Sequence, residues 1–206
     1  MWGLGIRPID NIIALFGSKG VRFMSLAEDC REVDTCSAWV DNIPFTFINP
    51  LKSVEQSRLD AAHELGCFVL HQKTKVQGKV REREADKFAL DFLMPRRGIL
   101  AAPPPTICME TLIEFKKKWR VSLAASAHRL HMLNRMKDWD YRMLCIRISN
   151  LDYEIHEPHE TSREEFVILK QAFQTLRKQG WTIEWISESL HIPVNKIKSL
   201  TFGAFV

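Results

Sequence analysis

The chain lacks apolar runs long enough to cross a membrane. Its longest uninterrupted apolar segments, such as residues 12–16, stop far short of the roughly 18–20 residues that span a bilayer. The sequence also shows no signal-peptide pattern at its start. We therefore expect a cytoplasmic protein with no membrane partner.

Paired cysteines and a one-sided charge are missing too. The five cysteines are scattered and form no CxxC motif, which excludes a disulfide-stabilised miniprotein and favours reduced thiols. The 29 basic residues nearly balance the 25 acidic ones, so the net charge of +4 does not by itself indicate nucleic acid. Hydrophobic residues make up 46% of the 206 positions, which excludes wholesale disorder and fits one or two globular domains.

The first fifty residues predict a helix followed by a small antiparallel sheet. Apolar residues at helical spacing indicate a short amphipathic helix over residues 8–16. Residues 21–26 alternate as a strand does, and residues 37–40 and 45–49 are two further strand-like runs. The segment 41–44 between these two runs indicates a hairpin with a four-residue turn.

Two longer helices are expected next. Residues 58–72 contain no proline, place apolar residues at helical spacing and follow Ser57, a suitable N-cap. Residues 81–94 show the same spacing, and Pro95 ends this second helix. These two helices carry the residues on which the functional argument depends.

Three consecutive prolines at residues 103–105 give the clearest linker signal in the chain. We place one domain at residues 1–100 and a helical region at residues 106–206, so the expected fold class is α+β in front and all-α behind. The helices expected in the second region cover residues 110–119, 123–133, 138–148, 164–178, 182–190 and 194–200. Residues 121–130 and 182–200 each resemble a helix-turn-helix pattern.

The first of the two motif helices contains the string HELGC at residues 63–67, one residue away from HExxH. In the full motif, two histidines on one helical face bind zinc, and the glutamate beside the first polarises a metal-bound water. Here Cys67 replaces the second histidine. A thiolate also binds zinc, but it reaches less far than an imidazole and its charge makes the metal a weaker Lewis acid. The string alone is weak evidence, because His and Glu also occur side by side by chance.

A catalytic zinc site needs a third protein ligand and leaves one position for water. The second motif helix offers carboxylates for this role. Glu82 shares a helical face with the small residues Ala85 and Ala89, which allow close packing against the first helix. Glu84 points elsewhere and is interpreted as part of a solvated charged face, and Asp86 lies nearby in the sequence.

The two motif helices also carry a matched pair of longer segments. Residues 57–66 are SRLDAAHELG and residues 82–95 are EREADKFALDFLMP. Together they resemble the ImmA/IrrE family of zinc metallo-endopeptidases, whose patterns are R-F-x-x-A-H-E-L-G-H and E-x-x-A-x-x-F-A-x-x-L-x-P. The resemblance extends upstream through residues 45–49 and downstream through the helix-turn-helix-like residues 119–130. Residues 163–202 look like the tail of members found beside, or fused to, XRE-type repressors.

The resemblance implies a zincin-like metallopeptidase domain at residues 1–100. It implies His63 as a zinc ligand, Glu64 as the general base and Glu82 as the carboxylate ligand. Cys67 stands where the family has its second histidine and is the remaining candidate ligand. Zinc is the implied metal and manganese the alternative, whereas a metal-free protein is expected if Cys67 has abolished the site.

The activity implied by the resemblance is endopeptidase cleavage of a helix-turn-helix (XRE-type) transcriptional repressor. Such cleavage relieves repression of stress-response or mobile-element genes. Because the segment before Pro8 has no room for a DNA-binding domain, we expect the repressor to be a separate protein. The alternative is a catalytically impaired pseudo-peptidase that binds a repressor or another regulatory protein without cutting it.

A third hypothesis is direct DNA binding by the helix-turn-helix-like segments. Lys116–Lys118, Arg129 and Arg135 would supply the positive charge. We do not expect DNA binding, because a lysine run is usually a solvated face and helical hairpins pack against one another in most all-α regions. The sequence assigns no oligomeric state.

Overall fold

The computed structural model of the chain divides into two compact units, each assembled from two separate stretches of sequence. It describes residues 2–26, 35–72, 76–153, 156–164 and 166–204. The helical unit comprises Met1–Asp10 and Ser53–Arg163, and the sheet unit comprises Asn11–Lys52 and Glu164–Val206. The predicted boundary between residues 100 and 106 would instead divide the chain into two continuous domains. That boundary stays a prediction.

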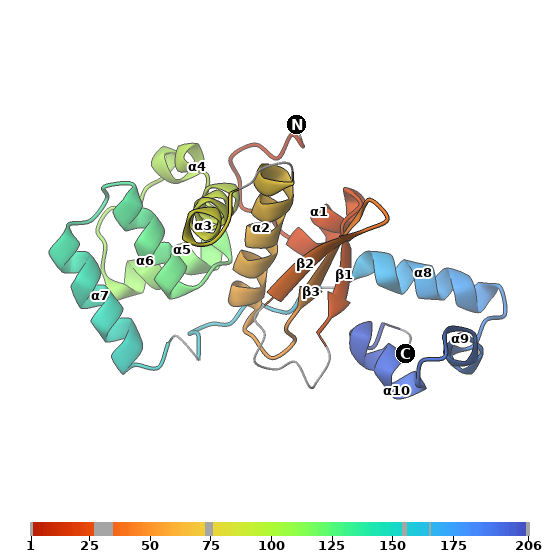
Figure 1. Cartoon of the computed structure of the whole chain (residues 1–206). Helices are drawn as coiled ribbons and strands as arrows, with labels where there is room; N and C mark the ends of the chain where they lie inside the picture. Colours follow the sequence, from red (N-terminus) through yellow and green to blue (C-terminus); the bar gives the residue numbers. More distant parts are fainter. Residues whose placement is uncertain (1, 27–34, 73–75, 154–155, 165, 205–206) are drawn as a thin grey trace. The chain divides into compact units, whose positions relative to one another are not determined.

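The sheet unit begins with a short helix and, over the described residues, a three-stranded sheet (Figure 1). These elements are α1 (Ile12–Ser18), β1 (Arg22–Ser25), β2 (Thr35–Val40) and β3 (Ile43–Ile48). β3 is the central strand, antiparallel to β2 and parallel to β1. The predicted hairpin is confirmed, but the sheet is mixed rather than antiparallel throughout. Side-chain alternation has the same period in parallel and antiparallel strands, so the pattern predicted the strands without their direction.

The hairpin turns over two residues rather than the four predicted. Asp41 and Asn42 both adopt the left-handed conformation, with φ of 48° and 62°. Asp and Asn tolerate this conformation better than most residues with a side chain, and two in succession give the tight turn whose twist matches paired strands. Ile43 and Pro44 therefore belong to β3, where they pair with Val40 and Trp39.

Three helices complete the sheet unit, and their existence agrees with the sequence analysis. They are α8 (Val167–Lys178), α9 (Ile183–Leu190) and α10 (Val194–Leu200). Their buried core consists of Ile183, Ile186 and Ile197. The Glu164 carboxylate accepts hydrogen bonds from the N–H groups of Ile12 and Ile13 at 2.8 and 3.1 Å. It thereby satisfies donors at the start of α1 that lack partners within the helix, and ties the two stretches of this unit together.

The helical unit consists of α2 (Val54–His71), α3 (Lys79–Leu93), α4 (Arg96–Ala101), α5 (Met109–Trp119), α6 (Leu123–Met132) and α7 (Asp138–Asn150). The spacing of apolar residues predicted these helices except α4. Ser53, and not Ser57, caps α2, because the Ser53 hydroxyl accepts a hydrogen bond from the Gln56 N–H at 3.2 Å. Pro95 follows α3 as expected and is also the N-cap of α4. Over the described residues, no helix is long and apolar enough to cross a membrane.

Three charged side chains lie together in the core of the helical unit. The Lys116 ammonium on α5 contacts the Glu55 carboxylate on α2 at 2.9 Å and the Glu157 carboxylate at 3.2 Å. None of the three side chains is more than 2% exposed. The Thr161 N–H and hydroxyl also donate to Glu55, and the Leu123 N–H donates to Glu157. This buried ion cluster joins α2, α5, the start of α6 and the segment after α7.

Burial and pairing act in opposite directions on the two carboxyl groups. Burial raises the pKa of Glu157 although Lys116 opposes the shift. Burial also acts to raise the pKa of Glu55, but hydrogen bonds from Lys116 and Thr161 outweigh it, so that pKa is lowered. The expected solvated face over Lys116–Lys118 is therefore wrong for Lys116, whose charge is balanced in the core, while Lys117 and Lys118 are exposed.

Replacing Lys116 with Met is expected to lower the free energy of unfolding by about 3–5 kcal/mol, because two buried carboxylates lose their cation. Lys117→Met is the matched control. Lys117 pairs with Glu114 at 2.8 Å, but its side chain is 38% exposed, so its loss is expected to cost less than about 0.5 kcal/mol. Urea denaturation of both variants measures the difference. Equal stability of the two variants would contradict the role assigned to the cluster.

Candidate functional site

The candidate site lies where α2 packs against α3. These two helices make the most extensive helix–helix contact in the helical unit. Ala62, Ala85 and Ala89 are completely buried. A Cβ placed on Gly66 would stand 3.0 Å from the Phe88 ring, which is tighter than ordinary contact. Small residues therefore bring the two backbones close, as the sequence pattern predicted.

His63 stands in the middle of α2 and faces two carboxylates of α3. Its Nδ1 atom lies 2.8 Å from an Asp86 oxygen, and its Nε2 atom lies 3.2 Å from a Glu82 oxygen. The imidazole is largely covered, with 19% of the side chain exposed, whereas both carboxylates are open to solvent. The structure thus brings His63 and Glu82 together, as the sequence analysis expected.

Asp86 is the partner that the sequence analysis did not assign. It lies four residues after Glu82, so both carboxylates project from the same face of α3. That spacing is the feature of the sequence that could have identified Asp86 as a neighbour of His63. A carboxylate on one imidazole nitrogen fixes the ring orientation and leaves the other nitrogen to act as a ligand, which is the usual arrangement around a metal-binding histidine.

The surroundings of His63 favour its protonated form in the metal-free chain. A hydrogen bond with the Cys67 side chain raises the pKa of His63 most. Burial lowers this pKa, whereas the hydrogen bond with Asp86 raises it. Together these effects raise the pKa of His63 to about 9. Cys67 is buried one helical turn after His63. It is therefore close enough to interact with the imidazole it was predicted to join in a ligand set.

Glu64, the predicted general base, is a buried residue of α2 with 9% of its surface exposed. Its assignment rests on its place directly after His63 in the motif. The roles of His63, Glu64, Cys67 and Glu82 remain predictions.

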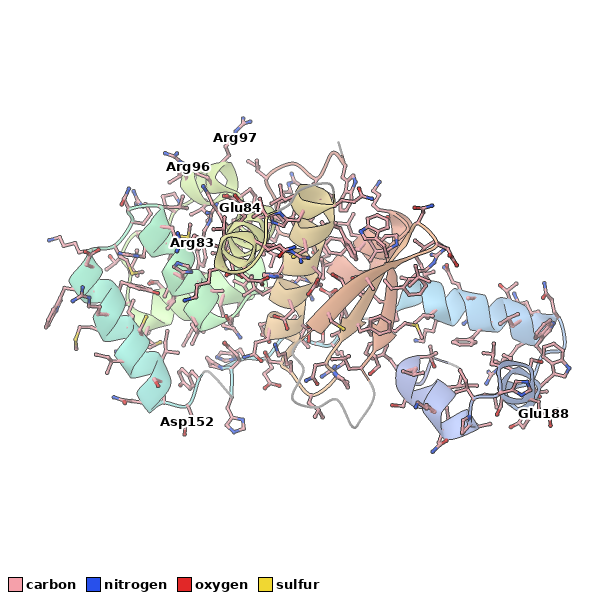
Figure 2. All side chains as sticks on the ribbon, in the orientation of Figure 1. Arg83, Glu84, Arg96, Arg97, Asp152 and Glu188 are labelled. Carbon is pink, nitrogen blue, oxygen red and sulfur yellow. The ribbon has the colours of Figure 1, made fainter. Side chains whose placement is uncertain are left out.

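Glu84 contacts a different histidine of α2 from the one that Glu82 contacts. It lies on α3 beside Arg83 (Figure 2). One of its carboxylate oxygens lies 3.7 Å from Nε2 of His71, the last residue of α2. Glu84 is half exposed, so the expectation of a charged surface position holds, with His71 as an additional neighbour.

Two buried arginines hold the motif helices at their ends. Arg58 on α2 donates to the carbonyl oxygen of Ile9 at 2.6 Å. Burial, with Arg120 acting in the same direction, lowers the pKa of Arg58 to about 10, which leaves it charged at neutral pH. Arg129 on α6 donates to the Met94 carbonyl at 3.0 Å, at the end of α3. These contacts limit sliding of α2 and α3, and so maintain the spacing between His63 and its carboxylates.

The donor set can be compared with what zinc requires. Nitrogen, sulfur and carboxylate oxygen are all zinc donors, and two ligand atoms about 2.0–2.2 Å from a tetrahedral ion stand roughly 3.3–3.5 Å apart. The 3.2 Å between His63 Nε2 and Glu82 Oε2 is close to that spacing. Over the described residues, no group of three or more His, Cys, Asp or Glu side chains is arranged to hold a metal. His63, Glu82 and Cys67 are donor types that zinc accepts, and their assignment as its ligands stays a prediction.

Comparison with known proteins supplies the family. The chain matches the IrrE N-terminal-like domain, a peptidase family, over residues 14–131, which is more than half of its length. The chain belongs to this metallopeptidase-like family. The resemblance inferred from the motif helices is thereby confirmed. A comparison with curated proteins finds no match.

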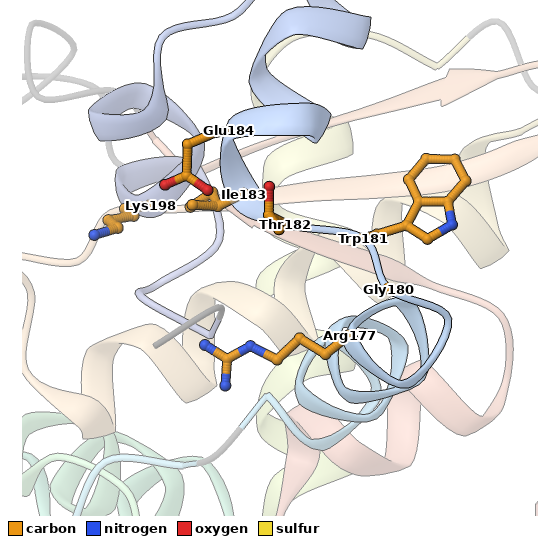
Figure 3. A pocket seen from close by; sticks show the side chains of 7 residues that line it. All are labelled: Arg177, Gly180, Trp181, Thr182, Ile183, Glu184 and Lys198. Carbon is orange, nitrogen blue, oxygen red and sulfur yellow. The ribbon is translucent and has the colours of Figure 1, made fainter.

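The IrrE N-terminal-like domain includes α2 and α3 and thus all four predicted site residues. The helices α7 to α10 follow its end at residue 131. Among them, the segment around α9 forms a pocket of about 640 Å³ (Figure 3). Seven residues line it: Arg177, Gly180, Trp181, Thr182, Ile183, Glu184 and Lys198. Figure 3 shows Glu184 and Lys198 on the same side of this pocket. Its mixed charge gives no argument for DNA binding, which stays unexpected.

Proposed function

We propose that the chain is a zinc-dependent endopeptidase that cleaves a separate XRE-type repressor. The observation that carries the proposal is the position of His63. Its Nε2 atom lies beside the Glu82 carboxylate while Asp86 holds Nδ1, on the HExxC helix of a metallopeptidase-like family. That arrangement matches an oriented ligand and its neighbouring ligand.

In this proposal His63, Cys67 and Glu82 hold the ion. Zinc, when bound, supplies Lewis-acid polarisation and lowers the pKa of a water molecule. Asp86 accepts a hydrogen bond from the Nδ1–H group of His63 and orients the ring, so that the lone pair of Nε2 remains available to the ion. Glu64 takes a proton from the attacking water and later delivers it to the leaving amine. The imidazole is largely covered, which limits competition from solvent at this nitrogen.

The repressor substrate is the part of the proposal that rests on the family resemblance. XRE-type repressors are folded helix-turn-helix proteins, and cleavage would remove their DNA binding. Stress-response or mobile-element genes would then be expressed. A manganese-dependent activity is the alternative within the same chemistry, although a thiolate ligand suits zinc better than manganese.

Zinc affinity tests the ligand set directly. Glu82→Ala is expected to weaken zinc binding at least about 100-fold, because it removes a coordinating oxygen beside Nε2. Glu84→Ala is the matched control on the same helix and is expected to change the affinity less than about threefold, since Glu84 faces His71. Competition with a chromogenic chelator measures both values. Equal loss in the two variants would remove Glu82 from the ligand set.

Cleavage of a purified XRE-type repressor from the source organism tests the base and the thiolate. Glu64→Gln is expected to reduce the cleavage rate at least about 100-fold, because the amide cannot accept the proton. Cys67→His is expected to raise it about tenfold, because a neutral ligand leaves the metal a stronger Lewis acid. Cys36→His, at an exposed cysteine, is the control and should leave the rate unchanged. A Glu64→Gln variant that still cuts would rule out Glu64 as the base.

The second candidate is a pseudo-peptidase that binds a repressor without cutting it. Two observations favour it: Cys67 replaces the second histidine, and the described side chains form no ready group of three donors. It predicts a protein that is metal-free after purification, keeps its thermal unfolding midpoint in a chelator and still binds the repressor. Metal analysis by mass spectrometry, with binding measured by calorimetry, separates it from the enzyme, which should retain about one zinc ion per chain.

A further inference from the structure

Helix α7 carries an apolar stripe on its exposed face. Trp139, Met143 and Ile146 have 71%, 47% and 54% of their surface exposed. The opposite side of the same helix is buried through Leu144 and Ile148, and it packs against α6. One face of α7 therefore belongs to the core of the helical unit, and the other presents large apolar side chains to solvent.

The spacing of the three side chains makes them a single surface. They are four and three residues apart, so they lie one above the other along the helix. Single exposed apolar residues are common on proteins, but a Trp, a Met and an Ile in one row on a 13-residue helix are typical of an interaction surface.

Charges along one flank of the stripe indicate its partner. Asp140 stands near the start of α7 and Arg147 stands seven residues later, two turns along the same flank. Both are exposed. The point midway between residues 143 and 144 is equally far from Asp140 and from Arg147 along the helix axis. A two-fold axis through that point would place Asp140 of one chain at the height of Arg147 of another, and the reverse.

We propose that the chain forms a symmetric dimer in which α7 packs antiparallel against α7 of a second copy. The apolar stripes interdigitate in this arrangement. Met143 lies next to Met143 of the second copy at the centre, and Trp139 lies between the levels of Ile146 and Asn150 of that copy. Two Asp140–Arg147 pairs close one side of the interface, since equivalent flanks meet in an antiparallel helix pair.

Helix polarity also favours the antiparallel pairing. The first turn of α7 carries Asp138 and Asp140, and Arg147 lies in its last turn. A parallel pair would set acidic residues beside acidic ones at one end, whereas the antiparallel pair sets acidic beside basic at both ends. The same acidic turn would repel a phosphate backbone or an anionic membrane, whereas the acidic first turn and basic last turn of α7 complement those of a second, antiparallel copy.

The size of the surface sets the expected strength. A 13-residue helix is about 20 Å long, and one helix pair of this length buries less than the roughly 1,200 Å² of a typical stable interface. We therefore expect reversible dimerisation with a dissociation constant of about 10–100 µM. Sedimentation velocity of the full chain across a concentration series measures it.

Charge exchange tests the pairing. Asp140→Arg alone and Arg147→Asp alone each place like charges opposite each other, and each is expected to weaken the dimer at least about tenfold. The double variant with both changes restores the pairs with the signs exchanged, and its dissociation constant should return to within about threefold of the original. Arg142→Asp is the matched control, because it makes the same charge change on the other flank and should have less than about a threefold effect.

Met143→Glu tests the apolar stripe, since it places two carboxylates against each other at the centre of the interface. It is expected to abolish the dimer while the far-ultraviolet circular dichroism spectrum and the unfolding midpoint stay unchanged, because Met143 is exposed in the monomer. The proposal is overturned if the wild-type chain sediments as a monomer at all concentrations up to about 300 µM. A dimer that survives Met143→Glu also overturns it, as does a double exchange that fails to restore association.

Discussion

The close packing of α2 against α3 is the constraint on which the candidate site depends. Ala62, Ala85 and Ala89 are fully buried, and a Cβ on Gly66 would stand only 3.0 Å from the Phe88 side chain. A helix pair separated by larger side chains would place carboxylates of α3 out of reach of an imidazole on α2. The small residues therefore have a chemical consequence, because they make His63 and Glu82 neighbours at 3.2 Å.

The packed pair is held by polar contacts that are themselves buried. Arg58 and Arg129 bind backbone carbonyls at the N-terminal segment and at the end of α3. The buried ion cluster of Glu55, Lys116 and Glu157 connects the first turn of α2 with α5 and with the segment after α7. Buried ion pairs give little net stability compared with apolar packing, but an unpaired member is costly. A shift in the register of these helices would leave a buried charge without its partner.

Periodicity was sufficient to predict most of the helices and the separation of Glu82 from Glu84, because helical spacing determines which residues share a face. It could not predict strand direction, since alternation is the same in parallel and antiparallel pairs, so β1 was placed in an antiparallel sheet. It also could not show that Lys116 is buried, because the partners of that ammonium come from residues 61 positions before it and 41 after it. Asp86 shares the helical face of Glu82, so the same spacing places it near His63, but a motif that specifies metal ligands does not specify the carboxylate that orients the imidazole. The direct contact between His63 and Glu82 required the structure.

In the proposed ligand set, the replacement of the second histidine by Cys67 changes the charge of the site more than the number of its zinc ligands. With one imidazole, one thiolate and one carboxylate, the ligands would neutralise a divalent ion, whereas two imidazoles and one carboxylate leave one positive charge. A neutral centre lowers the pKa of a bound water less, so more of the proton transfer falls to Glu64. Asp86 would also weaken the activation of a bound water, because a carboxylate on Nδ1 makes the imidazole a more electron-donating ligand. In the proposed ligand set these charges favour holding the ion over activating water, so slow turnover with firm metal retention is the behaviour expected of the proposed enzyme.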